Sequence, residues 1–282
     1  MKLLLVRPLG GIANRMRVLE SAYNFAAAAS SKLVVFWERN GNLNARFSEC
    51  FEPVANMQVI EMDMHGSGFT DKINRRLLDM AARTFSGFLA DKAITDSTIE
   101  EKLLEYNFQL PAMRNYFNAL GLQNRGIRID TCLEFYPNQK NFQLEILRPI
   151  QFKSMSILKN SGPVIGVHVR RTDNYHAIEK SPLDAFIEEI KWTISVSPQT
   201  KFYLSTDSQE VSESLKGLFP DHIIVGVSTR NRDSKEGITD ALTDLCCLSM
   251  CNEIWGSQDS SFSDRAAKIK NIPLKIILQH AG

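Results

Sequence analysis

The hydrophobic and polar positions in the second half of the chain form short apolar runs separated by segments with helical spacing. The runs "PVIGVHV", "KFYLSTD", "HIIVGV", "EIWGS" and "LKII" predict strands. The segments "SPLDAFIEEIKWTI", "SQEVSESLKGLF", "GITDALTDLCCLSMC" and "SSFSDRAAKI" lie between them and predict helices. Strands that alternate with helices in this way predict a doubly wound α/β sheet.

The first half shows the same alternation less regularly. "KLLLV" predicts a buried strand, "PLGGIANR" a glycine-rich turn, "RMRVLESAYNFAAAAS" a helix and "KLVVFWE" a second strand, so parallel pairing is expected. Residues 71–90 and 98–106 have helical spacing, and the pattern breaks at Pro149, before a short helix in "KSMSILKN". We therefore predict two α/β domains, residues 1–150 and residues 151–282.

One helix start in the second half has a capping pattern. In "SPLDAF", Ser181 is expected to be the N-cap, Pro182 the first helical residue and Asp184 the acidic partner of a capping pair.

Composition and charge exclude several classes of protein. With 44% hydrophobic residues the chain can bury a sizeable core, and 33 basic against 32 acidic residues do not suggest a general nucleic-acid or membrane-surface role. The opening apolar run is four residues long and is cut by Arg7 and Pro8, which is too short for a signal peptide. No stretch approaches the ~18 apolar residues of a membrane span.

The five cysteines are an odd number without a zinc-binding spacing, and Cys246, Cys247 and Cys251 are expected to pack as small apolar groups. We expect a reduced, cytoplasmic protein and leave peripheral membrane association open.

Polar residues gather where the predicted strands of the second half end. They are His168, Arg170, Arg171 and Asp173 after the first strand, Ser205, Thr206 and Asp207 after the second, and Ser257, Gln258, Asp259, Ser260 and Ser261 near the last. Ligands of open α/β sheets bind beyond the carboxyl ends of the strands, so these side chains should meet along one rim.

These residue types suit a pyrophosphate. The period-2 rule places His168 and Arg170 on one side, so that Arg170 enters the cleft, while Arg171 braces a carboxylate, either Asp173 or Asp207. A guanidinium fork matches phosphate oxygens. Ser260 and Ser261 are expected at a helix start, where backbone N–H groups and the helix dipole favour an anion.

The N-terminal "GGIANR" is a second candidate. Gly10 and Gly11 allow a tight turn and close backbone approach, and Asn14 and Arg15 are expected to face the cleft between the domains. The segment is neither a G-x-G-x-x-G fingerprint nor a P-loop, which argues against a nicotinamide-dependent dehydrogenase. The sequence contains no H-E-x-x-H, paired C-x-x-C or G-x-S-x-G motif, so we assign no metal site and no nucleophile elbow.

Each of these patterns also has a structural interpretation. "RRTD" can be a solvated ion-pair cluster, His168 a core histidine and "SSFS" a capping segment. Asp240 and Asp244 lie four residues apart on one helix face, where like charges cost a few tenths of a kcal/mol, which mildly hints at a purpose, but a solvated face is the default interpretation.

Four motifs resemble those of one enzyme superfamily. "GVHVRRTD", "FYLSTDSQEV" and "DALTDLCCLSMCNEIWGSQDSSFSDRAAKI" resemble, in order, the three signatures of the α1,6-fucosyltransferases, including the bacterial nodulation fucosyltransferase. "GGIANRM" is similar to the N-terminal loop of the α1,2- and protein O-fucosyltransferases. The matches cover most of residues 160–270 and the N-terminus. Residues 45–145, where acceptor recognition is expected to vary, resemble no family that we can name.

This resemblance to GDP-fucose-dependent fucosyltransferases implies a GT-B fold, with two Rossmann-like domains facing a cleft. The first domain would be the acceptor side and the second would bind the nucleotide sugar. The resemblance further implies GDP-fucose as the donor, a saccharide acceptor, inversion at the anomeric carbon and no required metal.

Roles follow from the resemblance position by position. Arg170 would hold the β-phosphate, with support from Arg171, Asp207 would belong to the donor site and His168 would line it. Asp244 would read the guanine edge, with Asp240 as the alternative. Ser260, Ser261 and Phe262 would lie along the diphosphate and ribose, and Gly11 and Asn14 would close the cleft from the first domain.

The chemistry also needs a base that takes the proton of the acceptor hydroxyl. Glu179 is the nearest carboxylate beyond Asp173, and Asp173 is its competitor. Two other functions fit the same residues. One is the same scaffold with another nucleotide sugar, and the other is a nucleotide-binding protein without transfer activity.

Overall fold

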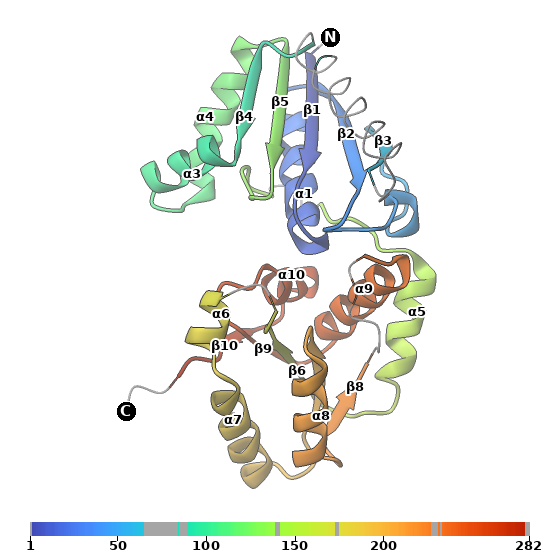
Figure 1. The fold of residues 1–282 in the computed structure, drawn as a ribbon. Coiled ribbons are helices and arrows are strands. Elements are labelled where there is room, and N and C mark those ends of the chain that lie inside the picture. Colours follow the sequence, from blue (N-terminus) through green and yellow to red (C-terminus); the bar gives the residue numbers. More distant parts are fainter. Residues whose placement is uncertain are drawn as a thin grey trace. The chain divides into compact units, whose positions relative to one another are not determined.

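The chain folds into two α/β units, each built on one five-stranded sheet whose described strands pair in parallel (Figure 1). The computed structural model describes residues 2–64, 84, 89–138, 142–172, 175–226, 231 and 233–279, with only the backbone of residues 176 and 177. The predicted α/β class with two doubly wound sheets is confirmed.

The sheet of unit 1 has the strand order β3-β2-β1-β5-β4. The strands are β1 (Lys2–Pro8), β2 (Ser31–Arg39), β3 (Met57–Asp63), β4 (Lys92–Thr95) and β5 (Gly126–Thr131), and the helical segments are α1 (Ile12–Ala28), η1 (Phe47–Glu49), α3 (Asp96–Glu105) and α4 (Leu110–Gln123). The helix predicted at 98–106 corresponds to α3. The helix predicted at 71–90 lies almost entirely outside the described residues.

Arg15 of α1 is fully buried, so the prediction that it faces a cleft is wrong. Its guanidinium donates to the carbonyl oxygen of Gly10 at 3.0 Å, to that of Glu38 at 2.5 Å and to Oδ1 of Asn40 at 3.1 Å. The guanidinium carbon also lies 4.8 Å from the centroid of the Trp37 ring. Burial lowers the pKa of Arg15 to about 10, against the opposing effect of Glu38. Arg15 thus ties the loop after β1 to the end of β2.

The sheet of unit 2 has the strand order β10-β9-β6-β7-β8. Its strands are β6 (Val164–Val169), β7 (Lys201–Thr206), β8 (Ile223–Val225), β9 (Glu253–Gly256) and β10 (Leu274–Ile276), and its helices are α5 (Arg148–Ile157), α6 (Tyr175–Lys180), α7 (Leu183–Val196), α8 (Gln209–Leu218), α9 (Lys235–Ser249) and α10 (Ser261–Lys270). The chain runs from β6 toward β8 on one side and from β9 to β10 on the other. The border between β6 and β9 is therefore the topological switch point.

Two local predictions in unit 2 need correction. Pro149 does not break the structure, because α5 begins at Arg148 and tolerates proline in its first turn, where the missing N–H would have no helical partner. Ser181 is not the N-cap of α7. Pro182 occupies that position, and the Ser181 hydroxyl instead accepts a hydrogen bond from the backbone N–H of Gln258 at 2.9 Å.

The two units differ from the predicted ranges at residues 147–150 and 232–238. Unit 1 is Met1–Ile146 with Arg232–Ile238, and unit 2 is Leu147–Asn231 with Thr239–Gly282. Within unit 1, Lys235 pairs with Glu49 at 2.8 Å, and Asn44 donates to the carbonyl of Asp233. These contacts place the first turn of α9 in unit 1, while the rest of this helix belongs to unit 2.

The core of unit 2 consists of side chains from the sheet and from the helices that cover it, including Phe186, Phe202, Leu215 and Trp255. Cys246, Cys247 and Cys251 are buried without a disulfide, and burial raises their pKa to about 11 or 12, so they pack as apolar groups.

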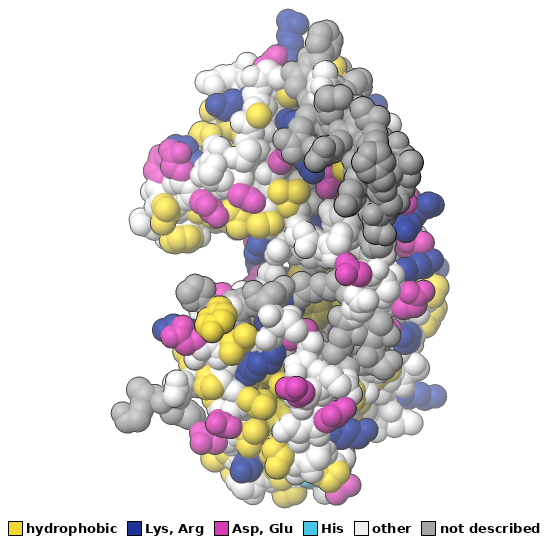
Figure 2. Space-filling model, viewed as in Figure 1, with side chains coloured by type: hydrophobic (Ala, Val, Ile, Leu, Met, Phe, Trp, Pro, Cys, Tyr) yellow, Lys and Arg dark blue, Asp and Glu magenta, His cyan; other side chains and the backbone are white. Residues whose placement is uncertain are grey.

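The surface carries both signs of charge. On the face shown in Figure 2, Lys and Arg side chains are interspersed with Asp and Glu, in keeping with the balanced totals. Among the described helices, none is long and apolar enough to cross a membrane.

Candidate functional site

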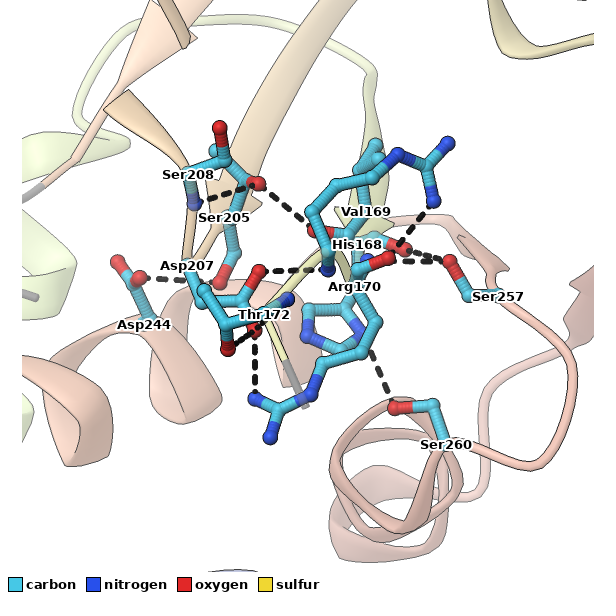
Figure 3. A network of polar contacts seen from close by, with 12 residues as sticks. His168, Val169, Arg170, Thr172, Ser205, Asp207, Ser208, Asp244, Ser257 and Ser260 are labelled. Carbon is cyan, nitrogen blue, oxygen red and sulfur yellow. Dashed lines mark hydrogen bonds and ion pairs between the residues drawn. The ribbon is translucent and has the colours of Figure 1, made fainter. Parts of the chain in front are cut away.

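The carboxyl end of β6 is the centre of the candidate site in unit 2. His168 on β6 is paired in register with Ser205 on β7 and with Gly256 on β9. The residues that follow these three strands therefore emerge side by side at the switch point, where ligands of open α/β sheets bind. Figure 3 shows polar residues that follow these strands gathered at one end of the sheet, as predicted, among them His168, Arg170, Ser205, Asp207, Ser257 and Ser260, while Asp173 lies outside the described residues.

Arg170 and Asp207 form an ion pair directly beyond the ends of β6 and β7 (Figure 3). Nη1 of Arg170 lies 2.9 Å from Oδ2 of Asp207, and both side chains are mostly buried, with 17% and 14% exposed. The backbone N–H of Arg171 donates to Oδ1 of Asp207 at 2.7 Å, and the Thr172 hydroxyl donates to Oδ2 at 2.7 Å. Asp207 is thus a hub that fixes the loop after β6.

The pKa of Asp207 reflects these contacts. Burial alone would raise the pKa of this carboxyl, but the charge of Arg170 and the hydrogen bonds from Thr172 and the Arg171 N–H outweigh it and lower the pKa. Asp207 is therefore ionised at neutral pH and holds Arg170 at the strand end.

Among the described residues, the Arg171 side chain donates to backbone carbonyl oxygens and not to Asp207, so the Asp207 alternative is corrected, while Asp173 lies outside the described residues. Nη1 of Arg171 donates to the carbonyl oxygen of Arg170 at 2.7 Å and its Nη2 to that of Ser181 at 2.9 Å. Burial lowers the pKa of Arg171, with Asp207 opposing the shift. The guanidinium that pairs with Asp207 belongs to Arg170, while the Arg171 side chain hydrogen-bonds to the backbone on either side of the loop after β6.

His168 is buried and contacts the start of α10. Its Nδ1 lies 3.3 Å from Oγ of Ser260, and its ring lies 5.0 Å from the ring of Phe262, centroid to centroid, at 31°. Ser257 joins β9 to β6, because its backbone N–H donates to the His168 carbonyl at 3.2 Å and its Oγ accepts from the Arg170 N–H at 3.1 Å.

Helix α10 begins at this rim. Ser260 is the N-cap residue, but its hydroxyl makes no capping hydrogen bond and contacts His168 instead. Asp259 precedes it with φ 54°, in the left-handed region, which turns the chain into the helix. Ser261 and Phe262 are the first two helical residues and are half-buried. The first-turn N–H groups of α10 therefore lie beside the loop that carries Arg170.

Asp244 of α9 is buried against β7. Its Oδ1 accepts from the Tyr203 hydroxyl at 2.5 Å, and its Oδ2 accepts from the Ser205 hydroxyl at 2.9 Å. Asp240, one turn earlier on α9, pairs instead with Nζ of Lys153 on α5 at 2.7 Å. The predicted solvated face is wrong for both carboxylates, because both are buried.

The N-terminal loop lies in unit 1, after β1. Gly10 has φ 77°, so the predicted tight turn requires glycine there, and the Asn14 side chain packs over it. Gly11 is the N-cap of α1 with an extended backbone, and a Cβ added there would meet no described atom within 4 Å. Oδ1 of Asn14 is buried and has no hydrogen-bond partner among the described residues.

Of the two residues predicted as the base, the structure describes only Glu179. Glu179 lies in the short helix α6 with an exposed side chain, and Asp173 lies outside the described residues. In the described parts of the chain, no group of three or more His, Cys, Asp and Glu side chains is arranged to hold a metal ion.

Three residues of the site did not emerge from the sequence. Thr172 and Tyr203 hydrogen-bond to Asp207 and Asp244, and Lys153 pairs with Asp240. The signal for Tyr203 was present, since it shares a strand face with Ser205 at period 2. Lys153 comes from a helix about 90 residues away along the chain, and spacing alone could not have paired it with Asp240.

The stability of unit 2 should depend on pH through Asp207. Because its pKa is lower in the folded chain, its stabilisation is present above the unfolded pKa, near 4, and is lost as the pH falls through the folded pKa. We therefore expect the destabilisation caused by Asp207→Asn to be largest at neutral pH and to shrink toward pH 3, measured by urea unfolding across this range. The exposed Asp221→Asn serves as control. A pH-independent effect of Asp207→Asn would contradict the assignment.

Comparison with known proteins found similar folds among solved structures only. No family model and no curated protein matches the sequence. Among solved structures, fucosyltransferase NodZ from Bradyrhizobium is 20% identical with a TM-score of 0.60, covering 94% of this chain and 93% of NodZ. The NodZ α-1,6-fucosyltransferase soaked with GDP-fucose has the same identity and TM-score.

Two further fucosyltransferases are similar. POFUT1 in complex with GDP-fucose is 11% identical with a TM-score of 0.57, covering 98% of both chains. A variant of Arabidopsis thaliana FUT1 in complex with GDP is 13% identical with a TM-score of 0.61, covering 100% of this chain and 71% of FUT1. The chain therefore has the GT-B fold of these fucosyltransferases.

Proposed function

We propose that this protein is a glycosyltransferase that moves fucose from GDP-fucose to a hydroxyl group of a saccharide acceptor. The observation that carries the proposal is the Arg170–Asp207 ion pair at the switch point of the unit 2 sheet, beside the N-terminus of α10. The GDP and GDP-fucose complexes of proteins with the same fold support this choice of donor.

The diphosphate would lie between Arg170 and the first turn of α10. Arg170 can direct guanidinium N–H groups toward two phosphate oxygens, and the N–H groups at a helix start attract the same charge. The ring of His168 and Ser260, Ser261 and Phe262 would line this region, with the loop supported by Arg171. Asp244 would read the guanine base, and Gly11 and Asn14 would supply the donor contacts of unit 1.

The reaction would proceed with inversion at the anomeric carbon. The acceptor oxygen attacks this carbon from the face opposite GDP, and the bond between the carbon and the β-phosphate oxygen breaks, leaving its electron pair on the phosphate. Arg170 and the N–H groups of α10 stabilise that charge, which is the task a divalent metal performs in other transferases. A carboxylate, Glu179 or Asp173, takes the proton of the acceptor hydroxyl.

Two alternatives use the same site. The scaffold could act on another nucleotide sugar, or it could bind a nucleotide without transfer. The cytoplasmic location and the saccharide nature of the acceptor stay predictions.

Donor hydrolysis tests the proposed function directly. Purified protein is incubated separately with GDP-fucose, GDP-mannose, UDP-glucose and UDP-N-acetylglucosamine. A coupled assay for the released GDP or UDP should show the fastest release from GDP-fucose. Faster release from GDP-mannose or a UDP-sugar would assign another donor. GDP binding without hydrolysis or transfer of any donor would favour a nucleotide-binding protein.

Arg170→Lys should lose most of the activity, because a point charge cannot bind two phosphate oxygens as a planar fork does. The expected decrease in turnover of GDP-fucose is about 10²-fold or more, the usual effect of removing one donor to a developing oxyanion. Arg148→Lys changes an exposed arginine of the same unit and is the matched control. Turnover of Arg170→Lys near the wild-type value would remove Arg170 from the diphosphate site.

A chelator should leave the reaction unaffected. If Arg170 and the α10 N–H groups stabilise the leaving diphosphate, excess EDTA does not remove any catalytic charge. GDP-fucose turnover measured with and without EDTA should therefore be equal. Inhibition by EDTA that manganese reverses would show that the charge stabilisation depends on a metal.

A further inference from the structure

The Asp244 carboxylate is held in a cradle of two hydroxyl groups. Tyr203 and Ser205 belong to the same face of β7 and donate to different oxygens of Asp244, at 2.5 Å and 2.9 Å. The Tyr203 side chain is fully buried and Ser205 is 4% exposed, so both hydroxyl groups are shielded from solvent. Each oxygen of Asp244 thus has its own fixed donor, which sets the plane of the carboxylate.

Gly226, the residue after β8, leaves room for the cradle. A Cβ added at this position would lie 1.8 Å from the Tyr203 hydroxyl oxygen, so any larger residue would displace the hydroxyl or the loop. Burial raises the pKa of Tyr203 well above its usual range, and the neighbouring Asp244 adds to the shift. The hydroxyl therefore stays protonated and acts as a donor to Asp244.

Asp244 joins a helix to a strand through a buried carboxylate, which stabilises the fold less than an apolar contact would. Burying it costs free energy even when hydroxyl groups donate to it, and an apolar pair of similar volume would attach α9 to β7 without that cost. A carboxylate offers about four acceptor sites, so a ligand with two parallel N–H groups can bind beside the two hydroxyl donors. Guanine presents such a pair at N1 and at its 2-amino group.

The cradle lies next to the candidate diphosphate site. Ser205 of the cradle and Asp207, the partner of Arg170, are two residues apart at the end of β7, about 7 Å along an extended chain. One strand end thus orients both a buried carboxylate and the arginine assigned to the diphosphate. This arrangement suits a ligand with a hydrogen-bonding base at one end and two phosphates at the other.

We propose that Tyr203 and Ser205 are positioning residues for base specificity: they orient Asp244 so that it accepts N1–H and the 2-amino group of guanine. The inference rests on the proposed function, because it assumes that a guanine nucleotide binds in unit 2. It adds that specificity for guanine resides in the hydroxyl cradle and not in Asp244 alone.

The test compares GDP with inosine diphosphate, which lacks the 2-amino group and is otherwise identical. Isothermal titration of the full chain gives a Kd for each nucleotide, and their ratio reports recognition of that group. The wild-type ratio should favour GDP by about tenfold or more, typical of a hydrogen bond to a charged group. Asp244→Asn should bring the ratio close to one, and Tyr203→Phe and Ser205→Ala should each reduce it severalfold.

Matched variants separate positioning from stability. Ser249 is a buried serine of α9 whose hydroxyl donates to the Cys246 carbonyl at 2.8 Å, so Ser249→Ala removes a comparable hydrogen bond outside the cradle. Its ratio should equal that of the wild type, whatever its melting temperature. The ratio is insensitive to the fraction of folded protein, which affects stoichiometry and not the comparison of two Kd values.

The outcomes that overturn the inference are distinct. If Tyr203→Phe and Ser205→Ala lower the melting temperature but leave the ratio unchanged, the cradle is only a structural anchor. If Asp240→Asn, and not Asp244→Asn, abolishes the preference, the base is read one turn earlier on α9. If wild-type protein binds neither nucleotide, the proposed function itself fails, and if it binds both equally, base reading at Asp244 fails alone.

Discussion

The ion pair between Arg170 and Asp207 links the ends of β6 and β7, and the candidate site is assembled around it. A parallel sheet brings the carboxyl ends of its strands to one edge, so a guanidinium that ends one strand must lie near whatever ends the next. Here the neighbour is a carboxylate that also accepts hydrogen bonds from the Arg171 N–H and from Thr172. Arg170, Arg171 and Thr172 are therefore held in place by Asp207 at the start of the loop after β6, which is the condition for a preorganised site.

Unit 1 also has an arginine near a strand end, Arg15, but the described hydrogen bonds of its side chain go to no carboxylate. Arg15 follows a glycine turn at the carboxyl edge of that sheet, as Arg170 follows a strand at the edge of the other. The donors of Arg15 go to two backbone carbonyls and to Asn40, and its guanidinium stacks on Trp37. The Arg15 guanidinium is buried in these contacts and has a structural role. An arginine at a strand end is thus a candidate ligand only when its surroundings fix it and leave part of it exposed, as for Arg170, whose side chain is 17% exposed.

This contrast explains which parts of the structure the sequence could predict. The strands and helices follow from apolar runs and helical spacing, and the meeting of His168, Ser205 and Gly256 follows from the parallel register. Hydrogen-bond partners did not follow. Nothing in "RRTD" says which arginine pairs with Asp207, because that depends on the direction in which the chain leaves β6. Nor could spacing show that Ser181 serves the Gln258 N–H instead of capping α7.

The fold and the contacts within the site also differ in how far they support a function. At 10–22% identity, the similarity to these fucosyltransferases shows the fold of this chain alone, and a fold of this type hosts many reactions. The argument for a GDP-sugar must come from the site. A diphosphate needs positive charge at the switch point, where Arg170 and the start of α10 lie, and a guanine needs an oriented pair of acceptors, the role we propose for Asp244 held by Tyr203 and Ser205. These groups lie at adjacent strands of one sheet, and residues chosen only to stabilise that sheet would not need to include a buried carboxylate at all.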